Sequence, residues 1–323
     1  MSVSAVIPNW NRRDLLVALL EQLKGQTVPI GEIIVVDNGS TDGSADEAER
    51  FGATVIRLTK NLGFCRAVNE GLARCRGEWI AVLNNDVEPA PDWLELLLGA
   101  VTPRHWFACG KLLDAQSRQI LDGTFDLVAR SACAWRAGHG CPDSSSWSRP
   151  REIWSAPFTA VLFRANLIDK VGQLDEDFES YLEDIDFGIR CQRADCRGLF
   201  VPEALAWHAG SATFGKWSPD TVRLIARNQL LLIAKHYPDD WLFRYGWPVL
   251  VGQSLWGLLA LRHGQLFPFL RGKTEGVRMF GPKRAASPRG YVAPVLEGGE
   301  REIRELQSST ASDLYWRLYF ALT

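Results

Sequence analysis

The chain has 323 residues, of which 46% are hydrophobic, so it can bury the core of one large domain or of one domain with a substantial appendage. Its formal charge of −2 gives no electrostatic reason to bind nucleic acid, and no basic helix or aromatic RNA-binding signature is present. The composition therefore excludes a largely disordered chain and a general nucleic-acid binder, and it favours a protein that acts on small molecules.

The cysteines predict a reducing compartment. Seven of them occur without CxxC pairs or the spacing of a zinc site, in a chain too large to need disulfide bonds for stability. The sequence also passes from Met1 straight into an apolar strand-like segment, without a basic leader or a signal core. We therefore expect reduced thiols in a cytoplasmic protein.

The first hundred residues alternate between strand and helix signals. In chain order we expect a strand at 3–8, a helix at 13–25, a strand at 32–36, a helix at 42–51, a strand at 54–58, a helix at 64–74, a strand at 79–83 and a helix at 92–101. Such alternation implies parallel strands that are joined by right-handed crossovers.

The pattern weakens between residues 108 and 151, where residues 143–149 are expected to form an exposed loop. Beyond it we expect a strand at 152–164, a helical turn at 166–171, a helix at 181–194, a strand at 198–202, a Gly-rich loop at 206–215, helices from 219 onward, a flexible linker at 283–299 and a final helix at 300–321.

The region beyond residue 219 is rich in tryptophan and contains a mostly apolar stretch at 246–261. Its sixteen residues fall short of the ~20 that span a bilayer. Aromatic and cationic side chains flank it, as they do in segments that lie at a membrane surface: Trp241, Phe243, Arg244, Tyr245, Trp256, Arg262, Phe267 and Arg271. A peripheral membrane contact and an ordinary buried or homo-oligomer contact are both open readings.

Two apolar runs end in polar clusters. Residues 33–36 run into Asp37, and residues 79–83 run into Asn84-Asn85-Asp86. Because ligands bind outside the carboxyl ends of parallel strands, these side chains are expected at one sheet edge. Asp37 could accept hydrogen bonds from a nucleoside, and Asp86 could bind a divalent cation together with phosphate oxygens. Each cluster alone is equally compatible with a turn or a helix cap.

A third acidic group lies at the start of the helix expected at 181–194. Glu183, Asp184 and Asp186 occupy its first turn, where acids are stabilised by the helix dipole. One of these carboxylates, turned into a cleft, could instead accept a proton from a substrate hydroxyl, with Asp186 or Arg190 orienting the site. His208, beside Gly and Ser, could bind a metal or a diphosphate, or could be structural.

Five ordered motifs together resemble the family 2 glycosyltransferases, most closely the bacterial rhamnosyltransferase-like branch. They are VIPNWNR at 6–12, VVDNGSTD at 35–42, NLGFCRAVNEG at 61–71, NND at 84–86 and EDxD at 183–186. The resemblance covers residues 3–215. It implies an α/β chain with a GT-A fold, that is, a mixed and mainly parallel sheet, here with a helical C-terminal appendage. It also implies the inverting transfer of a sugar from a nucleoside diphosphate donor with the help of Mg²⁺ or Mn²⁺.

The resemblance assigns roles by position. Asp184 matches the catalytic base, with Glu183 beside it, and Asp86 and His208 match the metal ligands. The residues matched to donor nucleotide binding are Pro8, Asn9, Arg12, Asp37, Asn61, Arg66, Asn69, Asn84 and Asn85. Many members have Asp where this chain has Asn84, so metal binding is expected to depend most on Asp86.

We therefore expect a catalytic domain at 1–218, with a nucleotide-binding half at 1–105 and an acceptor half at 106–218, followed by a helical region at 219–323. The expected donor is dTDP-rhamnose or a UDP-sugar, and the expected acceptor is a lipid-linked saccharide of a bacterial surface polysaccharide. The protein would then work in the cytoplasm, at the inner face of the membrane. Two alternatives are a sugar-1-phosphate nucleotidyltransferase, whose Gly-rich basic loop is missing near the first strand, and a non-catalytic subunit that binds nucleotide sugars.

Overall fold

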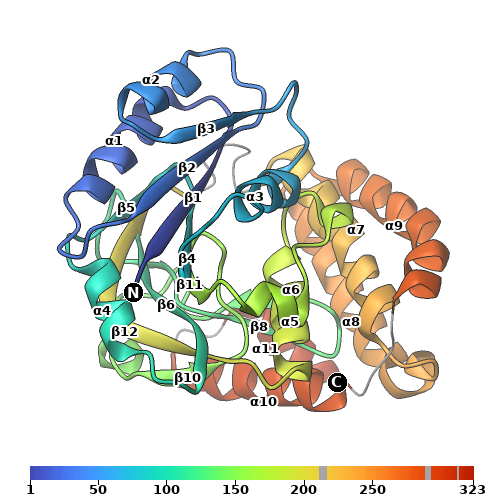
Figure 1. Ribbon diagram of the computed structural model, residues 1–323. Helices are drawn as coiled ribbons and strands as arrows, with labels where there is room; N and C mark the ends of the chain where they lie inside the picture. The colour runs from blue at the N-terminus through green and yellow to red at the C-terminus, as the bar shows by residue number, and fades with distance from the viewer. Residues whose placement is uncertain (211–216, 288–291, 311–312) are drawn as a thin grey trace.

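One mixed sheet organises the molecule in the computed structural model, which describes residues 1–210, 217–287, 292–310 and 313–323 (Figure 1). Its spatial order is β10-β12-β6-β11-β4-β1-β2-β3, with β5 beside β12 and β7 beside β6. The strands are β1 Val3–Asn9, β2 Glu32–Asp37, β3 Thr54–Arg57, β4 Trp79–Leu83, β5 Val87–Pro89, β6 His105–Asp114, β7 Leu121–Gly123, β10 Arg151–Ile153, β11 Ala160–Arg164 and β12 Arg197–His208.

The β–α alternation expected in the first hundred residues is confirmed. Strand β1 lies between β2 and β4 in parallel register, and β3 continues the sheet beyond β2. Every residue of β4 is buried, because helices cover both faces of this parallel part of the sheet. The connecting helices are α1 Arg13–Lys24, α2 Ser44–Arg50, α3 Phe64–Leu72 and α4 Trp93–Ala100.

The middle of the chain differs from the expectation. Strand β6 extends from residue 105 into the start of the weak region at 108–114, and it pairs in parallel with β12. The strand expected at 152–164 is two separate strands, since β10 pairs with β12 whereas β11 pairs with β4 and β6. Strand β12 continues past Pro202 to His208, which the Gly-rich loop prediction missed, and its register shifts between Phe200 and Leu205. That irregularity accommodates Pro202, which cannot donate to a regular ladder.

Shorter elements lie around this sheet. A hairpin of β8 Asp126–Val128 and β9 Ala134–Arg136 forms a small second sheet. The expected loop at 143–149 contains a short 3₁₀ helix whose Trp147 is buried, so it is only partly exposed. The remaining elements before residue 210 are α5 Leu167–Val171, a 3₁₀ turn at Glu176–Phe178 and α6 Glu183–Arg193.

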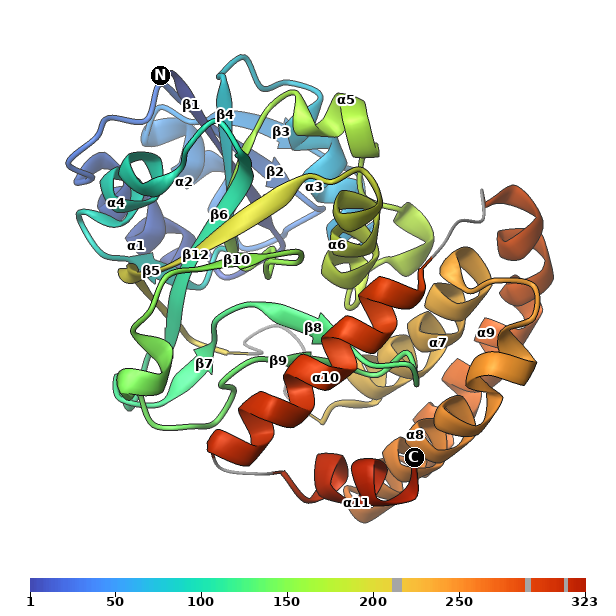
Figure 2. The ribbon, with the colours of Figure 1, turned by 90° about the horizontal axis from the view of Figure 1, so that it is seen from below.

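The C-terminal helices are α7 Pro219–His236, α8 Trp241–Arg262, α9 Leu266–Ala286, α10 Ala293–Ser309 and α11 Leu314–Leu322 (Figure 2). The described part of the linker expected at 283–299 is therefore mostly helical, since its start belongs to α9 and its end to α10. Pro294 occupies the first turn of α10, where proline is tolerated. Residues 288–291 of that linker lie outside the described residues. The final helix expected at 300–321 is two helices, with residues 311–312 also outside the description.

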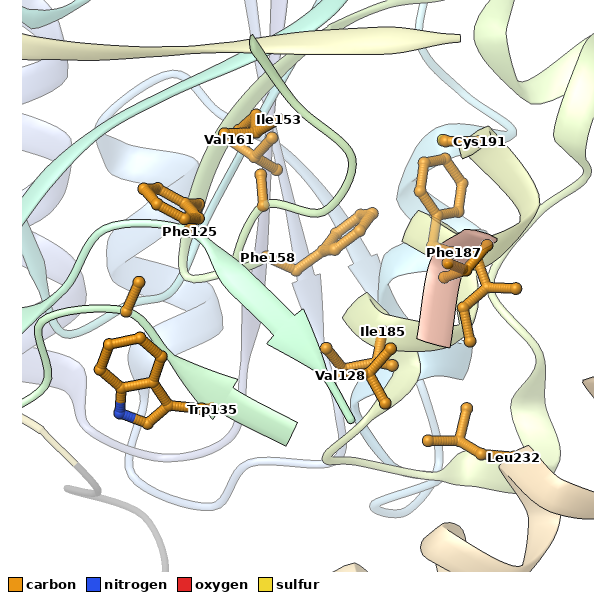
Figure 3. Packing of buried hydrophobic residues seen from close by; sticks show 14 of the residues in the cluster. Phe125, Val128, Trp135, Ile153, Phe158, Val161, Ile185, Phe187, Cys191 and Leu232 are labelled. Carbon is orange, nitrogen blue, oxygen red and sulfur yellow. The ribbon is translucent and has the colours of Figure 1, made fainter. Parts of the chain in front are cut away.

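Two apolar cores lie on opposite sides of the sheet. One joins the sheet to α1 and α4. The other joins it to α3, α6 and the β8–β9 hairpin, and Figure 3 shows its packing, where the rings of Phe158 and Phe187 meet edge to face at 5.2 Å. Leu232 of α7, Leu296 of α10 and Tyr319 of α11 belong to this same core. The division of the chain at 218/219 remains a prediction, and the helices beyond it share buried contacts with the sheet.

The structure also bears on two other expectations. All seven cysteines are free, as predicted. Among the described residues, no helix combines the length and the apolar character that crossing a membrane requires.

Candidate active site

Asn9 connects the two polar strand ends that the sequence singled out. The parallel register aligns Asn9 with Asp37, and the Asn9 amide nitrogen lies 3.4 Å from an Asp37 carboxylate oxygen. The Asn9 side-chain oxygen accepts a hydrogen bond of 2.7 Å from the amide of Asn85. Asp37 also accepts a bond from the backbone N–H of Ser40. The ends of β1, β2 and β4 thus form one hydrogen-bonded unit, in which Asp37 is fixed from several sides.

His208 lies beside Asp86 because of strand pairing. Strands β5 and β12 run antiparallel with His208 opposite Val87, and the N–H of Ala209 donates to the carbonyl of Asp86. The Nε2 atom of His208 is 3.2 Å from Asp86 Oδ1, and its Nδ1 atom is 2.9 Å from Asp122 Oδ2. The imidazole therefore bridges two carboxylates.

This pair fits a divalent cation. Two neighbouring ligands of an octahedral ion, each about 2.1 Å from it, lie about 3 Å apart, close to the separation of His208 Nε2 and Asp86 Oδ1. Asp122 would hold the imidazole through Nδ1, as carboxylates behind metal-binding histidines do. No cluster of three or more His, Cys, Asp or Glu side chains suited to a metal occurs in the described part of the chain. The remaining ligands would then come from substrate phosphates and water.

The charges around His208 favour a cation at this position, either the proton of the imidazolium or a metal ion that displaces it. Burial by itself lowers the pKa of His208, but its hydrogen bonds to Asp122 and Asp86 outweigh burial and raise the pKa to about 9. The two carboxylates thus stabilise a positive charge at this position. Nearby, Asn84 lines the same cleft, and its buried side-chain oxygen has no hydrogen-bond partner among the described residues.

Replacing Asp122 with Asn should weaken Mn²⁺ binding, because the charge that fixes the imidazole is lost. We expect a loss of about 10–100-fold in affinity, measured by Mn²⁺ titration in the presence of a nucleoside diphosphate. Asp114→Asn is the matched control, since Asp114 lines the same cleft but accepts hydrogen bonds from the backbone of Gln116 and Ser117. Equal Mn²⁺ affinities for Asp122→Asn and the control would contradict the positioning role.

A strained turn presents Glu183 and Asp184 at the first turn of α6. Three residues just before the helix have positive φ although none is glycine: Glu179 at 58°, Tyr181 at 70° and Leu182 at 65°. Such conformations persist only when surrounding contacts hold them. The fully buried Asn228 of α7 supplies those contacts, since its side-chain nitrogen lies 2.7–2.9 Å from the carbonyls of Phe178, Ser180 and Tyr181.

Asn228→Ala should therefore lower the free energy of unfolding by about 3 kcal/mol, because buried carbonyls lose their donor. Urea unfolding would measure the change. Asp220→Ala, at the exposed start of the same helix, is the control and should cost less than about 1 kcal/mol. If Asn228→Ala were as stable as the control, the turn before α6 would not depend on Asn228 for its conformation.

Arg136 connects the acids on opposite sides of the cleft. It lies across the hairpin from Asp126, with Arg136 Nε 3.1 Å from an Asp126 oxygen, and it also lies 3.4 Å from Asp184 and 3.9 Å from Asp122. Burial raises the pKa of Asp184 well above its ordinary value, and the charges of Asp126 and Glu183 add to that rise, whereas Arg136 opposes it. Burial likewise raises the pKa of Glu183 to about 7. One Glu183 oxygen has no hydrogen-bond partner among the described residues.

These groups line one cleft of about 660 Å³. Of the residues expected from the sequence, it is lined by Pro8, Asn9, Asn61, Asn84, Asn85, Asp86, Glu183, Asp184 and His208. The lining does not include Asp37, which is buried behind Asn9, or Arg12. Nor does it include Arg66, which pairs with Glu70 and Glu176, or Asn69, whose amide bonds the backbone of Leu174.

Asp186 does not lie where it could orient the site, which was the role considered for it from the sequence. It is fully buried and bonds Arg190, Lys235 and His236, so it anchors α6 to α7 and does not line the cleft. The sequence also missed Asp122, Asp126 and Arg136. Each lies in the region without clear periodicity. Asp126 and Arg136 face each other only because of the register between β8 and β9, two strands of three residues each. No motif in the sequence indicates it.

The cleft combines polar strand ends, a histidine beside a carboxylate and a buried acidic helix start. This is the arrangement expected of a nucleotide-sugar transferase of the GT-A type. Residues 4–119 match the family described as Glycosyl transferase family 2, and residues 79–262 match Glycosyl transferase family group 2. The chain belongs to the family 2 glycosyltransferases.

Relatives of this chain differ in length and in name. An N-acetylglucosaminyl-diphospho-decaprenol L-rhamnosyltransferase of Mycobacterium tuberculosis is 26% identical over 71% of this chain and 81% of its own length. The pre-mycofactocin glycosyltransferase of the same organism is 30% identical over 67% of this chain. An uncharacterized protein of Sinorhizobium fredii is 28% identical over 66% of this chain. The chain spans only 44% of the second relative and 25% of the third.

Solved structures confirm the fold. A mannosyltransferase from Pyrobaculum calidifontis, in complex with GDP-Man and Mn²⁺, covers 99% of this chain with a TM-score of 0.52 at 16% identity. The S. aureus protein TarS covers 78% of the chain, also with a TM-score of 0.52, at 18% identity. The expected α/β fold of the GT-A type, with a helical C-terminal region, is therefore correct.

Proposed function

We propose that this protein is an inverting glycosyltransferase that moves a sugar from a nucleoside diphosphate donor to a saccharide acceptor. The observation that carries the proposal is that one cleft is lined both by the Asp86–His208 pair and by the Glu183–Asp184 pair. A cation site for diphosphate and a base for an acceptor hydroxyl are what a single displacement requires.

The donor diphosphate is held at the Asp86 end of the cleft. A divalent cation held there would supply positive charge against the leaving diphosphate. The residues proposed to hold that cation are Asp86 and His208, with Asp122 fixing the imidazole. Asn9, Asn84 and Asn85 present amide groups for the nucleotide, and contacts with Ser44 and Asp37 hold the side chain of Asn9 in place.

Asp184 is proposed as the base. Its carboxylate removes the proton from the acceptor hydroxyl while that oxygen attacks the anomeric carbon and the bond to the diphosphate breaks. Attack from the face opposite the leaving group inverts the configuration. A carboxylate with a raised pKa holds the abstracted proton more firmly near neutral pH, which burial provides for Asp184 and Glu183.

The finer assignments are also proposals. The name of the M. tuberculosis relative specifies rhamnosyl transfer to a diphospho-decaprenol substrate, which supports dTDP-rhamnose and a lipid-linked acceptor in surface polysaccharide synthesis here, with a UDP-sugar as the other donor. Action at the cytoplasmic face of the inner membrane follows from such an acceptor. A non-catalytic subunit is the second candidate, because Asn84 replaces a carboxylate that many members of the family have.

The test combines donor binding with transfer. Thermal-shift screening of nucleotide sugars with Mn²⁺ identifies the donor, because a ligand that binds only the folded state raises its stability. The labelled donor is then incubated with a lipid-linked saccharide. We expect transfer that depends on Asp86, so that Asp86→Ala abolishes it. Pyrophosphate release from a nucleoside triphosphate and a sugar phosphate would indicate a nucleotidyltransferase, and donor binding without hydrolysis or transfer would indicate the non-catalytic subunit.

A further inference from the structure

The outer face of α8 is mostly apolar, with the exposed Ser254 between Leu250 and Leu258. Phe243, Trp247, Leu250, Leu258 and Leu261 recur at helical spacing on one side of this helix. Their exposed fractions run from 52% to 95%, the highest belonging to Phe243. An exposed apolar stripe of this length on a surface helix marks an interaction site.

The stripe continues onto two neighbouring helices. On α9, Phe267 is 83% exposed and Val277 is 66% exposed. On α11, Leu318 and Leu322 are also exposed, and the indole of Trp247 donates to the carbonyl of Leu322, so α11 joins the stripe directly. Figures 1 and 2 both place α8 and α9 together on the side of the molecule away from α1 and α2. We call the exposed apolar residues of α8, α9 and α11 the helical face.

Charge on these helices is strongly one-sided. Helix α8 contains no acidic residue, and α8, α9 and α11 together hold eight Lys and Arg residues against the single acid Glu275. Arg262, Arg278 and Arg317 are exposed, and within the described ranges no ion pair involves them. The acids just before α8, Asp239 and Asp240, are already paired with Arg284 and Arg244. This excess of cations contrasts with the chain's formal charge of −2.

The helical face reaches the rim of the cleft at the turn between α8 and α9. Trp217 stacks on His263 in that turn, with ring centroids 3.9 Å apart and an interplanar angle of 10°. Four residues later, Thr221 lines the cleft. The apolar residues Leu261 and Phe267 flank the same turn. A surface bound along α8 and α9 would therefore lie beside the α7 side of the cleft.

We propose that the helical face docks on an anionic lipid surface and so brings the cleft to a membrane-bound acceptor. The inference rests on the proposed function for the identity of the acceptor. Apolar side chains of a helix lying in the interface plane enter the boundary between headgroups and acyl chains, while cations on the same helices contact anionic headgroups. An apolar stripe together with three exposed arginines is the combination that such a surface recognises, whereas a second copy of this chain would place those like charges together.

Sedimentation of the full chain with vesicles tests the proposal. We expect binding to vesicles of phosphatidylglycerol and phosphatidylcholine in equal parts, and about tenfold weaker binding to phosphatidylcholine alone or in about 0.5 M salt. Phe243→Ser/Phe267→Ser should reduce binding to anionic vesicles by about tenfold or more without changing thermal unfolding, since both side chains are almost fully exposed. Leu62→Ser, an exposed apolar residue outside the helical face, is the matched control and should bind as the wild type does.

The outcomes separate this inference from the proposed function. Donor binding with Mn²⁺, followed by thermal shift, should be equal in wild type and in Phe243→Ser/Phe267→Ser, whereas transfer to a lipid-linked acceptor should fall more than transfer to a short soluble saccharide. Vesicle binding without any donor binding would overturn the proposed function and leave the docking intact. Donor binding without vesicle binding, or a wild-type dimer that the same double variant dissociates, would overturn the docking.

Discussion

Asp184→Asn should lower the rate of sugar transfer by about 10²–10⁴-fold, because the amide cannot accept the proton of the attacking hydroxyl. The substitution keeps the size of the side chain and the start of α6, so the fold and the donor site are retained. Transfer at saturating donor and acceptor measures the rate, and thermal shift with donor and Mn²⁺ shows that binding persists.

Asp195→Asn is the matched control, since the same substitution is made at an exposed residue just beyond the other end of α6. It should leave the rate within about twofold of wild type. Glu183→Gln distinguishes the two buried acids. It should reduce transfer less than Asp184→Asn does, and the reverse order would move the base role to Glu183.

The fold of residues 1–105 follows from local sequence signals. Strands β2 and β4 are short apolar runs, α1 has buried leucines at helical spacing, and the polar residues fall where the strands end. Because parallel strands end at one edge, the meeting of Asn9, Asp37 and Asn85 follows from the sheet itself. The family resemblance then assigned roles to Asp86, Asp184 and His208, and all three line the cleft.

The structure of residues 106–218 could not be predicted from local signals in the same way. Its geometry depends on pairings between distant strands, such as β6 with β12, where Gly110 lets the two backbones approach so closely that an added Cβ would meet the carbonyl of Ala204. The local hydrophobic periodicity of a sequence does not predict contacts between strands that lie far apart in the chain. The role of Asn228 could not be predicted either, because the sequence shows only a polar residue within a helix. Its three carbonyl partners are known only from the structure.

Arg136→Gln should lower kcat/KM near neutral pH by about tenfold or more and move the acidic limb of the pH–rate profile to higher pH. Arg136 opposes the raised pKa values of both Asp184 and Glu183, so its loss lets those values rise further. A base must be unprotonated to act, and activity should therefore fall at a higher pH in the variant. Arg136→Lys, which keeps a cation near the same carboxylates, should restore much of the wild-type profile.

The stability of the same variant should depend on pH with a definite sign. A carboxyl group whose pKa is raised on folding binds protons more readily in the folded state, so stability falls as pH rises from its unfolded pKa to its folded pKa. Without Arg136, the carboxylates of Asp126 and Asp184 lose their cation. We expect Arg136→Gln to cost about 3–5 kcal/mol at about pH 8 and clearly less at about pH 5, where protonation relieves the unpaired charge. Urea unfolding at the two pH values measures the difference. An equal cost at both would show that Arg136 stabilises the hairpin by packing, and the shift of the pH–rate profile would then be absent as well.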